Sequence, residues 1–242
     1  MRTRVVVAVG AIVAVIALAG GAGYVYYFSG LRTAPAQLGL SATPTATTTP
    51  TSTPATPGSL TGRWAVTSGS VAGYRIKELF VGQASKHEAV ARTSTITGGL
   101  TVSGDSSGYQ LSSLTFTANL SSLHSVDSVA GRDVTQRDGV VSRQLDVQQF
   151  PTATFVAISA TVPSAISSSA VDVTVTGKLT IHGVTRDVTI KAKAQLAGSK
   201  AEIAGNTSVV MTDYGVSPPP APFVTVDPTL LLEFDIFLVR AA

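Results

Sequence analysis

The sequence has no cysteine and only three histidines among its 242 residues. The absence of cysteine excludes disulfide bonds and lipid attachment through a thiol. His87, His124 and His182 lie far apart in the sequence and lack metal-ligand spacing. The chain also lacks a glycine-rich phosphate loop and a nucleophile elbow. The sequence therefore predicts no cofactor and no metal site.

Two short stretches are weak candidates for catalysis. The segment 104–108 (Gly-Asp-Ser-Ser-Gly) is similar to the surroundings of a serine-protease nucleophile, but no His or Asp context accompanies it, and a hairpin turn explains it better. The pair His87-Glu88 has the composition of half a proton-transfer pair, and an exposed polar loop is the favoured interpretation. We therefore predict that the protein is not an enzyme.

Charged residues make up only 13% of the chain and are unevenly placed. Arg2, Arg4 and Arg32 precede residue 61, whereas all 14 Asp and Glu follow it and equal the remaining Lys and Arg in number. The alkaline pI of about 9.3 therefore comes from the N-terminal part. Nucleic-acid binding requires clustered excess cations, so no nucleic-acid partner is predicted.

The N-terminal part predicts a membrane segment. Residues 1–4 form a basic start that would stay in the cytoplasm, and residues 5–28 carry no charge and end in clustered aromatic residues. This length and pattern favour an uncleaved single-pass signal anchor. The alternative is a signal peptide cleaved after Ala17-Leu18-Ala19, which would give a secreted protein. Both interpretations place the bulk of the protein outside the cytoplasm.

Residues 29–60 predict a disordered linker. From residue 33 onward they are almost entirely Thr, Ala, Pro and Ser, without a charge. Such a composition buries too little apolar surface to order itself. In polyproline geometry the stretch would hold a domain up to roughly 85 Å from the membrane. A plain spacer is favoured over a glycosylated stalk.

The stretch 171–194 gives the strongest structural signal in the chain. Apolar residues or glycine occupy the odd positions up to Ile181, and apolar residues occupy even positions from Val184 onward. A two-residue turn at His182-Gly183, with positive φ at Gly183, explains this change as a β-hairpin. In that register, Ile181 faces Val184 and Leu179 faces Arg186. Arg186 then either extends to solvent at a sheet edge or lies at a barrel mouth, where it would meet an anionic headgroup.

Strand signals recur through the rest of residues 61–242. Apolar rows begin at Trp64, Tyr74, Ile96 and Leu114, and further rows follow at Val156-Ile158-Ala160, at 203–211 and at 230–238. Only 125–149 lacks the two-residue period, and short helical turns are expected there. The pattern predicts an all-β fold, an antiparallel up-and-down barrel of about eight strands with a short helical insertion.

Four ordered motifs carry a resemblance to a known family. The segment 177–186 (Gly-Lys-Leu-Thr-Ile-His-Gly-Val-Thr-Arg) resembles the signature of the YceI-like family, and Trp64-Ala-Val, Phe150 to Phe155, and Met211 to Val216 match in the same order. The resemblance covers about residues 61–242. It implies an exported lipocalin-like barrel associated with polyisoprenoid lipids.

The chain departs from the family pattern near its first strand. Many members carry a histidine-serine pair after the early tryptophan, whereas this chain reads Trp64-Ala-Val-Thr-Ser-Gly-Ser70. The segment 77–80 (Lys-Glu-Leu-Phe) also differs. If these positions shape the mouth of a cavity, headgroup preference differs with them.

The leading hypothesis is a membrane-tethered extracytoplasmic protein that holds a long apolar lipid, of polyisoprenoid or isoprenoid quinone type, inside the barrel. The alternative is a structural or interaction domain of the cell envelope, with a filled core and no ligand. The candidate cavity-lining residues are Phe116, Phe155, Val175, Gly177, Leu179, Ile181, Arg186, Val188, Ile190, Phe234 and Ile236.

Overall fold

The computed structural model describes residues 34–41, 60–105, 107–129, 133–167, 169–197, 199–218 and 221–241. Within these ranges the first strands are β1 (Gly62–Val66), β2 (Val71–Phe80), β3 (His87–Thr93), β4 (Ile96–Asp105), β5 (Gly108–Asn119) and β6 (His124–Ser125). The later strands are β7 (Thr152–Val162), β8 (Val171–Ile181), β9 (Val184–Ala197), β10 (Lys200–Val210), β11 (Val224–Val226) and β12 (Thr229–Arg240). The helical elements are α2 (Gln136–Gln144) and the 3-10 turns η1 (Leu120–Ser122), η2 (Ser164–Ser167) and η3 (Met211–Tyr214).

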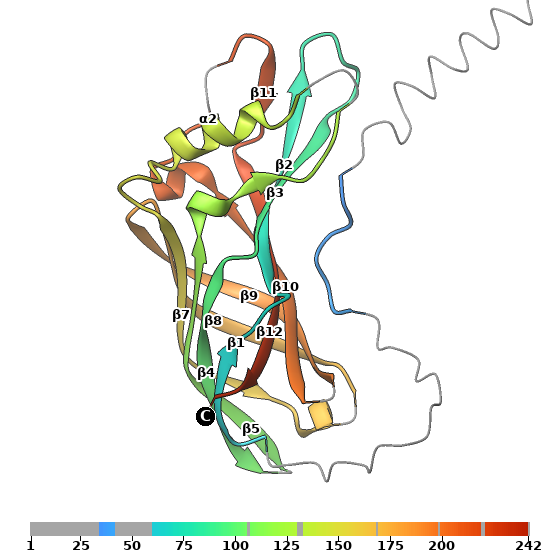
Figure 1. Ribbon diagram of the computed structural model, residues 1–242, viewed down its shortest axis with the longest axis vertical. Coiled ribbons are helices and arrows are strands. Elements are labelled where there is room, and N and C mark those ends of the chain that lie inside the picture. The colour runs from blue at the N-terminus through green and yellow to red at the C-terminus, as the bar shows by residue number, and fades with distance from the viewer. Residues whose placement is uncertain are drawn as a thin grey trace, which may run out of the picture.

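Eight of the strands close into a barrel (Figure 1). The order β1-β4-β5-β7-β8-β9-β10-β12 forms a ring because β1 also pairs with β12, and the pairings are antiparallel. The predicted barrel of about eight strands with one short helix is therefore confirmed. The sheet also extends beyond the ring, since β2 pairs with β12, β3 and β11, and β3 pairs with β6.

The hairpin β8–β9 has the predicted register. Ile181 pairs with Val184, Leu179 with Arg186, and the pairing continues along both strands to Val171 and Ala194. The turn differs in one detail, because His182 has a positive φ of 50° as well as Gly183, whose φ is 72°. Two consecutive positive φ angles are typical of the type I′ turn that matches strand twist.

The strand β7 corrects one predicted row. Val156 and Ile158 were expected to share a buried face with Ala160, but their exposed fractions are 44% and 89%. The buried residues are Phe155 and Ala157, followed by Ala160 and Val162. The alternation changes opposite Ser113 of β5, which has a φ of 52° and lies between two paired positions. This kink shifts the inward row by one residue on both strands.

The Ser70 side chain bridges the interruption between β1 and β2 with hydrogen bonds. The Ser70 hydroxyl donates to the Thr67 carbonyl at 2.8 Å and accepts from the Phe237 amide at 2.9 Å. It therefore replaces a main-chain partner for β12 where the strand is interrupted. Because β2 follows β1 along the same edge of β12, one edge of the barrel continues past its closed part.

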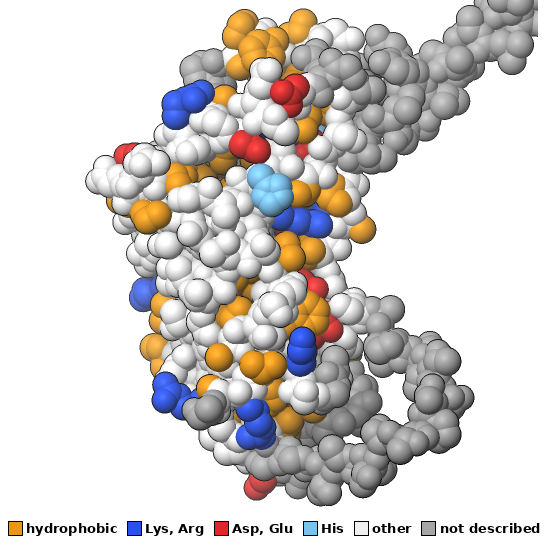
Figure 2. Space-filling view, viewed as in Figure 1, with side chains coloured by type: hydrophobic (Ala, Val, Ile, Leu, Met, Phe, Trp, Pro, Cys, Tyr) orange, Lys and Arg blue, Asp and Glu red, His pale blue; other side chains and the backbone are white. Residues whose placement is uncertain are grey.

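Elements at the upper end of the barrel in Figure 1 include α2, β11 and the β2–β3 hairpin, and the β4–β5 hairpin lies at the lower end. The helix α2 falls inside the stretch where short helical turns were predicted. It has no fully buried side chain. Figure 2 shows cations and anions interspersed on one face of the molecule.

The N-terminal predictions fall mostly outside the described residues. No helix in the described ranges is long and apolar enough to cross a membrane, and the expected anchor at 5–28 lies outside those ranges. Of the expected linker, residues 34–41 and Leu60 are described. Residues 34–41 differ from the predicted disorder because they make specific hydrogen bonds to buried side chains of the sheet. We call residues 34–41 the outer strap.

Candidate functional site

The inward rows of the barrel strands enclose a cavity with a volume of about 340 Å³. Side chains alternate between the two faces of a strand, so each strand contributes every second residue to this space. The volume falls within the range of ligand sites in proteins. An open cavity of this size differs from the filled core of the alternative hypothesis.

The cavity extends along the barrel. Its lining includes Val162 and Ile166, which lie at the end of β7 and in η2, and also Val140 and Gln144 of α2 at the opposite end. Apolar side chains dominate the lining between these ends. The shape and surface therefore suit an elongated apolar molecule better than a compact polar one.

The structure brings together most of the predicted lining residues. Eight of the eleven border the cavity: Phe116, Phe155, Val175, Leu179, Ile181, Ile190, Phe234 and Ile236. They come from five different strands, β5, β7, β8, β9 and β12. The other three predicted residues, Gly177, Arg186 and Val188, do not border the cavity. The surroundings of each residue explain why.

Gly177 is covered by an aromatic ring. A Cβ atom at this position would lie 2.5 Å from the Val156 carbonyl oxygen and 2.6 Å from Cζ of Phe155. The Phe155 ring therefore occupies the space that a side chain at 177 would need. A larger residue at position 177 would therefore overpack the barrel wall rather than extend into the cavity.

Val188 and Arg186 lie in the neighbouring strand β9 without reaching the cavity. Val188 is paired with Gly177 and is partly buried against the core. Arg186 is exposed, and its guanidinium donates to the Thr185 carbonyl at 3.4 Å. Of the two interpretations of Arg186, the structure agrees with extension to solvent.

A charged cluster at the α2 end of the cavity was missed in the sequence. Arg137 of α2 donates from one terminal nitrogen to both Asp127 oxygens, at 2.8 and 2.9 Å, and its other terminal nitrogen lies 3.4 Å from Glu78 Oε2. Asp127 also bonds to His87 Nε2 at 2.6 Å and accepts from the Val90 amide at 2.9 Å. Arg137 and Glu78 border the cavity.

The electrostatics of this cluster leave Arg137 without excess charge. Burial raises the pKa of Glu78 against the opposing charge of Arg137. Burial by itself would also raise the pKa of Asp127, but hydrogen bonds from His87 and Val90, together with the charge of Arg137, hold it below its usual value. Asp127 is therefore ionised at neutral pH and compensates the guanidinium.

His87 corrects a further prediction. It lies in β3 rather than in an exposed loop, and the exposed fractions of the His87 and Asp127 side chains are 1% and 0%. The predicted interpretation failed because the partner lies 40 residues away in the sequence. At this burial the pair orders the β3 end of the barrel, since a substrate would not reach it.

Two tyrosines add uncharged polar groups to the cavity wall. Tyr74 lines the cavity, and burial raises its pKa above its ordinary value, so its hydroxyl stays protonated. Tyr214 is 3% exposed, and its hydroxyl is buried without a hydrogen-bond partner in the described part of the chain. A buried unpaired hydroxyl costs about 1–3 kcal/mol. The Tyr214 hydroxyl is therefore available to donate a hydrogen bond into the cavity.

The residues considered for metal binding and for a serine nucleophile have structural surroundings of other kinds. No group of three or more potential metal ligands occurs within the described ranges. In the segment 104–108, Asp105 Oδ1 accepts from both the amide and the hydroxyl of Ser107, at 2.8 and 2.6 Å. This is the pattern of a turn stabilised by its own aspartate.

Comparison with known proteins agrees with the geometry of the barrel. Residues 64–238 match the family model of the YceI-like domain. The chain belongs to the YceI-like family. The matched residues run from within β1 to within β12.

Individual proteins resemble this YceI-like chain over part of its length or at low sequence identity. It is 37% identical over 95 residues to a UPF0312 protein of Pseudomonas putida and 39% identical over 95 residues to one of Pseudomonas fluorescens. The matches cover 37% of this chain and 47% of each relative, so the chain spans about half the length of the curated relatives it matches. A solved polyisoprenoid binding domain from Saccharophagus degradans has 15% identity and a TM-score of 0.53, covering 74% of this chain and 98% of its own. This likeness shows the fold alone.

Proposed function

We propose that the protein is an extracytoplasmic binding protein that holds one long apolar lipid of polyisoprenoid type inside its barrel. The observation that carries this proposal is the elongated apolar cavity between η2 and α2. Each buried methylene contributes on the order of 0.8 kcal/mol, so a prenyl chain binds there without specific polar contacts. An apolar cavity lining of this kind suits ligand binding rather than catalysis.

Two further observations support this function. The similar fold from Saccharophagus degradans is described as a polyisoprenoid binding domain. The apolar run 5–28 supports a single-pass anchor, with the barrel on the outer side of the membrane. Together they favour a lipid as the ligand and a membrane as its source.

The charges at the α2 end favour an uncharged headgroup. The described charged residues that border the cavity are Glu78, Arg137 and Glu233. The Glu233 carboxylate accepts hydrogen bonds from Arg75 and Arg92 on the outer face. Arg137 is already compensated by Asp127, with Glu78 beside it. A diphosphate would therefore add charge to the Arg137–Asp127–Glu78 cluster, in which the one arginine is already compensated.

An uncharged headgroup instead matches the tyrosines. Tyr214 offers a hydroxyl that has no partner in the described part of the chain, and Tyr74 offers one that stays protonated. A carbonyl or hydroxyl oxygen of the lipid would accept these hydrogen bonds without bringing a charge into the barrel. A prenyl alcohol or a quinone has such an oxygen.

The first experiment identifies the ligand directly. The full chain is purified from membranes and extracted with organic solvent, and the extract is weighed by mass spectrometry. We expect an isoprenoid lipid at close to one molecule per chain. A chain that carries no lipid and takes up no added polyprenol would overturn the proposed function.

The second experiment tests the headgroup with two probes of equal chain length, a polyprenol and a polyprenyl diphosphate. We expect the polyprenol to bind more tightly, and the Tyr214→Phe variant to bind it about tenfold more weakly, because one hydrogen bond is lost. Tyr109→Phe is the matched control, since Tyr109 also borders the cavity but lies at the start of β5, away from α2. Tighter binding of the diphosphate would refute the headgroup argument while leaving lipid binding intact.

A further inference from the structure

The strands β2 and β11 continue past the α2 end of the cavity and end in two apolar residues. Glu78 of β2 and Val226 of β11 are paired with each other, and both border the cavity. Just beyond the last pair of these strands, the Val81 amide donates to the Phe223 carbonyl at 3.0 Å. With a rise of about 3.3 Å per residue, Val81 lies about 10 Å beyond the cavity wall at Glu78. We call Val81 and Phe223 the apolar tip.

Both side chains of the apolar tip face solvent. Val81 is 71% exposed and Phe223 is 56% exposed, whereas Phe80, the preceding residue of β2, is buried. Figure 2 shows hydrophobic side chains at the top of its view, where Figure 1 places β11 and the β2–β3 hairpin. A Cβ atom at the neighbouring Gly82 would meet no heavy atom within 4 Å, so the hairpin projects into open space. Adjacent apolar side chains from two separate segments form an exposed patch, and such patches mark interaction sites.

The apolar tip has an uncharged surrounding. Residues 79–85 and 214–226 contain no Asp, Glu, Lys or Arg. The charged residues that follow these two segments, Lys86 and Asp227, bind each other at 2.6 Å. A partner recognised by its charge would therefore find no complement at the tip. The interface of a bilayer, in contrast, accepts uncharged apolar side chains.

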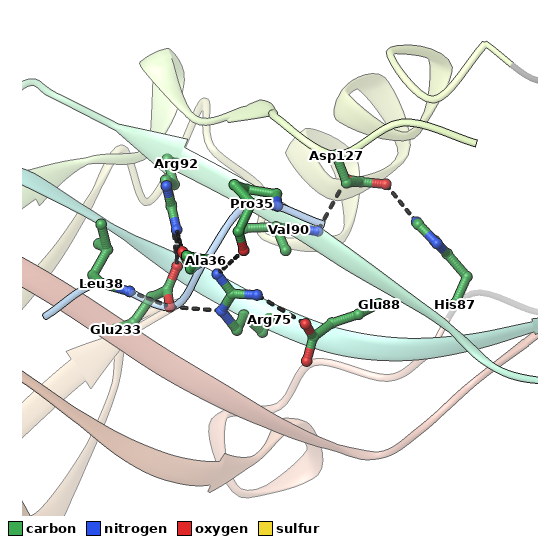
Figure 3. Close-up of polar contacts among 10 residues, drawn as sticks. All are labelled: Pro35, Ala36, Leu38, Arg75, His87, Glu88, Val90, Arg92, Asp127 and Glu233. Carbon is green, nitrogen blue, oxygen red and sulfur yellow. Dashed lines mark hydrogen bonds and ion pairs between the residues drawn. The ribbon is translucent and has the colours of Figure 1, made fainter. Parts of the chain in front are cut away.

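The outer strap begins on the side of the barrel that faces the apolar tip. Its contacts are, in chain order, Arg75 with the Pro35 carbonyl at 2.6 Å, the Leu38 amide with Glu233 at 3.1 Å, and the Ser41 amide with Glu202 at 2.6 Å; Figure 3 shows the first two. Arg75 is paired with Leu231 and Glu202 with Phe237, so the strap follows β12 from residue 231 to residue 237. Since β12 begins shortly after β11, the Pro35 end of the strap is the end nearer the tip.

Two lengths place a bilayer at the level of the apolar tip. Along β2, Val81 lies about 20 Å beyond Arg75, which holds Pro35. Residues 29–33, which separate the proposed anchor at 5–28 from the strap, span about 20 Å at full extension. The tip therefore extends as far from Pro35 as the anchor allows the bilayer surface to lie.

We propose that the apolar tip is a membrane-docking site, and that Val81 and Phe223 enter the interface of the bilayer that holds the anchor. This inference rests on the proposed function for the anchor and for the membrane as the source of the ligand. Docking sets the α2 end of the cavity about 10 Å from the lipids. The ligand then passes between bilayer and cavity along an uncharged surface.

The first test measures contact between the apolar tip and lipid. The full chain is reconstituted in phosphatidylcholine vesicles, with or without bromine on the acyl chains, because brominated lipid quenches an indole that it contacts. Phe223→Trp adds an indole at the tip, and the one natural tryptophan, Trp64, is buried and gives a background that the parent chain measures. Ile158→Trp is the matched control, since Ile158 is also exposed but lies in β7 toward η2.

We expect brominated lipid to quench Phe223→Trp more strongly than the parent chain, and Ile158→Trp no more than the parent chain. Equal quenching of the two variants would overturn the proposal. Quenching of Phe223→Trp that requires added anionic lipid would also overturn it, because the tip carries no charge.

The second test measures how fast the delipidated full chain takes up a polyprenol from phosphatidylcholine vesicles. We expect the double variant Val81→Ser with Phe223→Ser to load about tenfold more slowly and to reach the same final occupancy, because the bilayer loses two apolar contacts while the cavity is unchanged. Ile158→Ser is the control and should load at the parent rate. An unchanged rate in the double variant would refute the docking role, and a lower final occupancy would show that the two side chains act on the cavity instead.

The two tests separate this inference from the proposed function. A parent chain that takes up no polyprenol contradicts the proposed function, and quenching of Phe223→Trp then still decides whether the tip docks. A chain that binds polyprenol without quenching at the tip keeps the function and loses the docking site. Self-association that Phe223→Ser abolishes, in place of quenching, would show that a second copy of the chain covers the tip.

Discussion

Replacement of Gly183 by valine tests the hairpin that organises the barrel. Gly183 has a φ of 72°, and a Cβ there would lie 2.7 Å from Cε1 of Phe150. A β-branched residue at positive φ costs about 1–3 kcal/mol. Displacement of Phe150 also disturbs its edge contact with the His182 ring, with centroids 5.0 Å apart, a contact that contributes about 0.5–1.5 kcal/mol.

The two effects together predict a loss of roughly 2–4 kcal/mol, or about 5–15 °C in the melting temperature of a domain of this size. Thermal unfolding followed by circular dichroism, at equal lipid content, measures it. Gly82→Val is the control, because Gly82 has a φ of 80° but no heavy atom lies within 4 Å of the point that a Cβ would occupy. If Gly183→Val destabilises no more than Gly82→Val, the contact with Phe150 is not tight, and an unchanged melting temperature would refute the turn geometry.

Three other outcomes are expected. Gly177→Leu should destabilise the protein by about 1–3 kcal/mol in chemical unfolding, because Phe155 occupies the space it needs, and an unaltered midpoint would contradict that packing. Ser113→Gly should stabilise it by a few tenths to about 1 kcal/mol, because Ser113 has a φ of 52°, and a loss would show that its side chain matters more than its backbone. Between pH 4 and 7 the folded state holds a proton on Asp235 that the unfolded chain has lost, so stability should fall as pH rises, by less than about 1.4 kcal/mol per unit since solvent screens the group, and Asp235→Asn should flatten that slope.

The sequence predicted the barrel because its signal is local. Alternation along 171–194 sets both the register of β8–β9 and the face that turns inward, and the structure reproduces both. The same rule failed on β7, because the kink that shifts its inward row lies at Ser113, on a neighbouring strand. Period alone carries no information about a kink in another strand.

The polar features were not predictable from such patterns. The Arg75–Glu233 pair spans 158 residues of sequence, and the Asp127–His87 pair spans 40. The composition of the linker predicts disorder as an average property, but hydrogen bonds to the main chain of 34–41 leave no trace in side-chain composition. Contacts that involve only the backbone of a segment cannot be inferred from its residue types.

If the proposed anchor at residues 5–28 holds the protein in a membrane, the outer strap limits how far the barrel can lie from the bilayer. With an anchor that ends at Phe28, a free linker would give the barrel a radius of roughly 85 Å. Because Ala34 and Pro35 begin the docked segment, only residues 29–33 separate anchor and barrel, a span of about 20 Å at full extension. Residues 42–59 then connect two points on the same barrel and add nothing to this distance. A carrier on so short a tether would exchange its cargo with the membrane directly beneath it, and would not reach across the width of an envelope while Pro35 and Ala36 stay bound to the barrel.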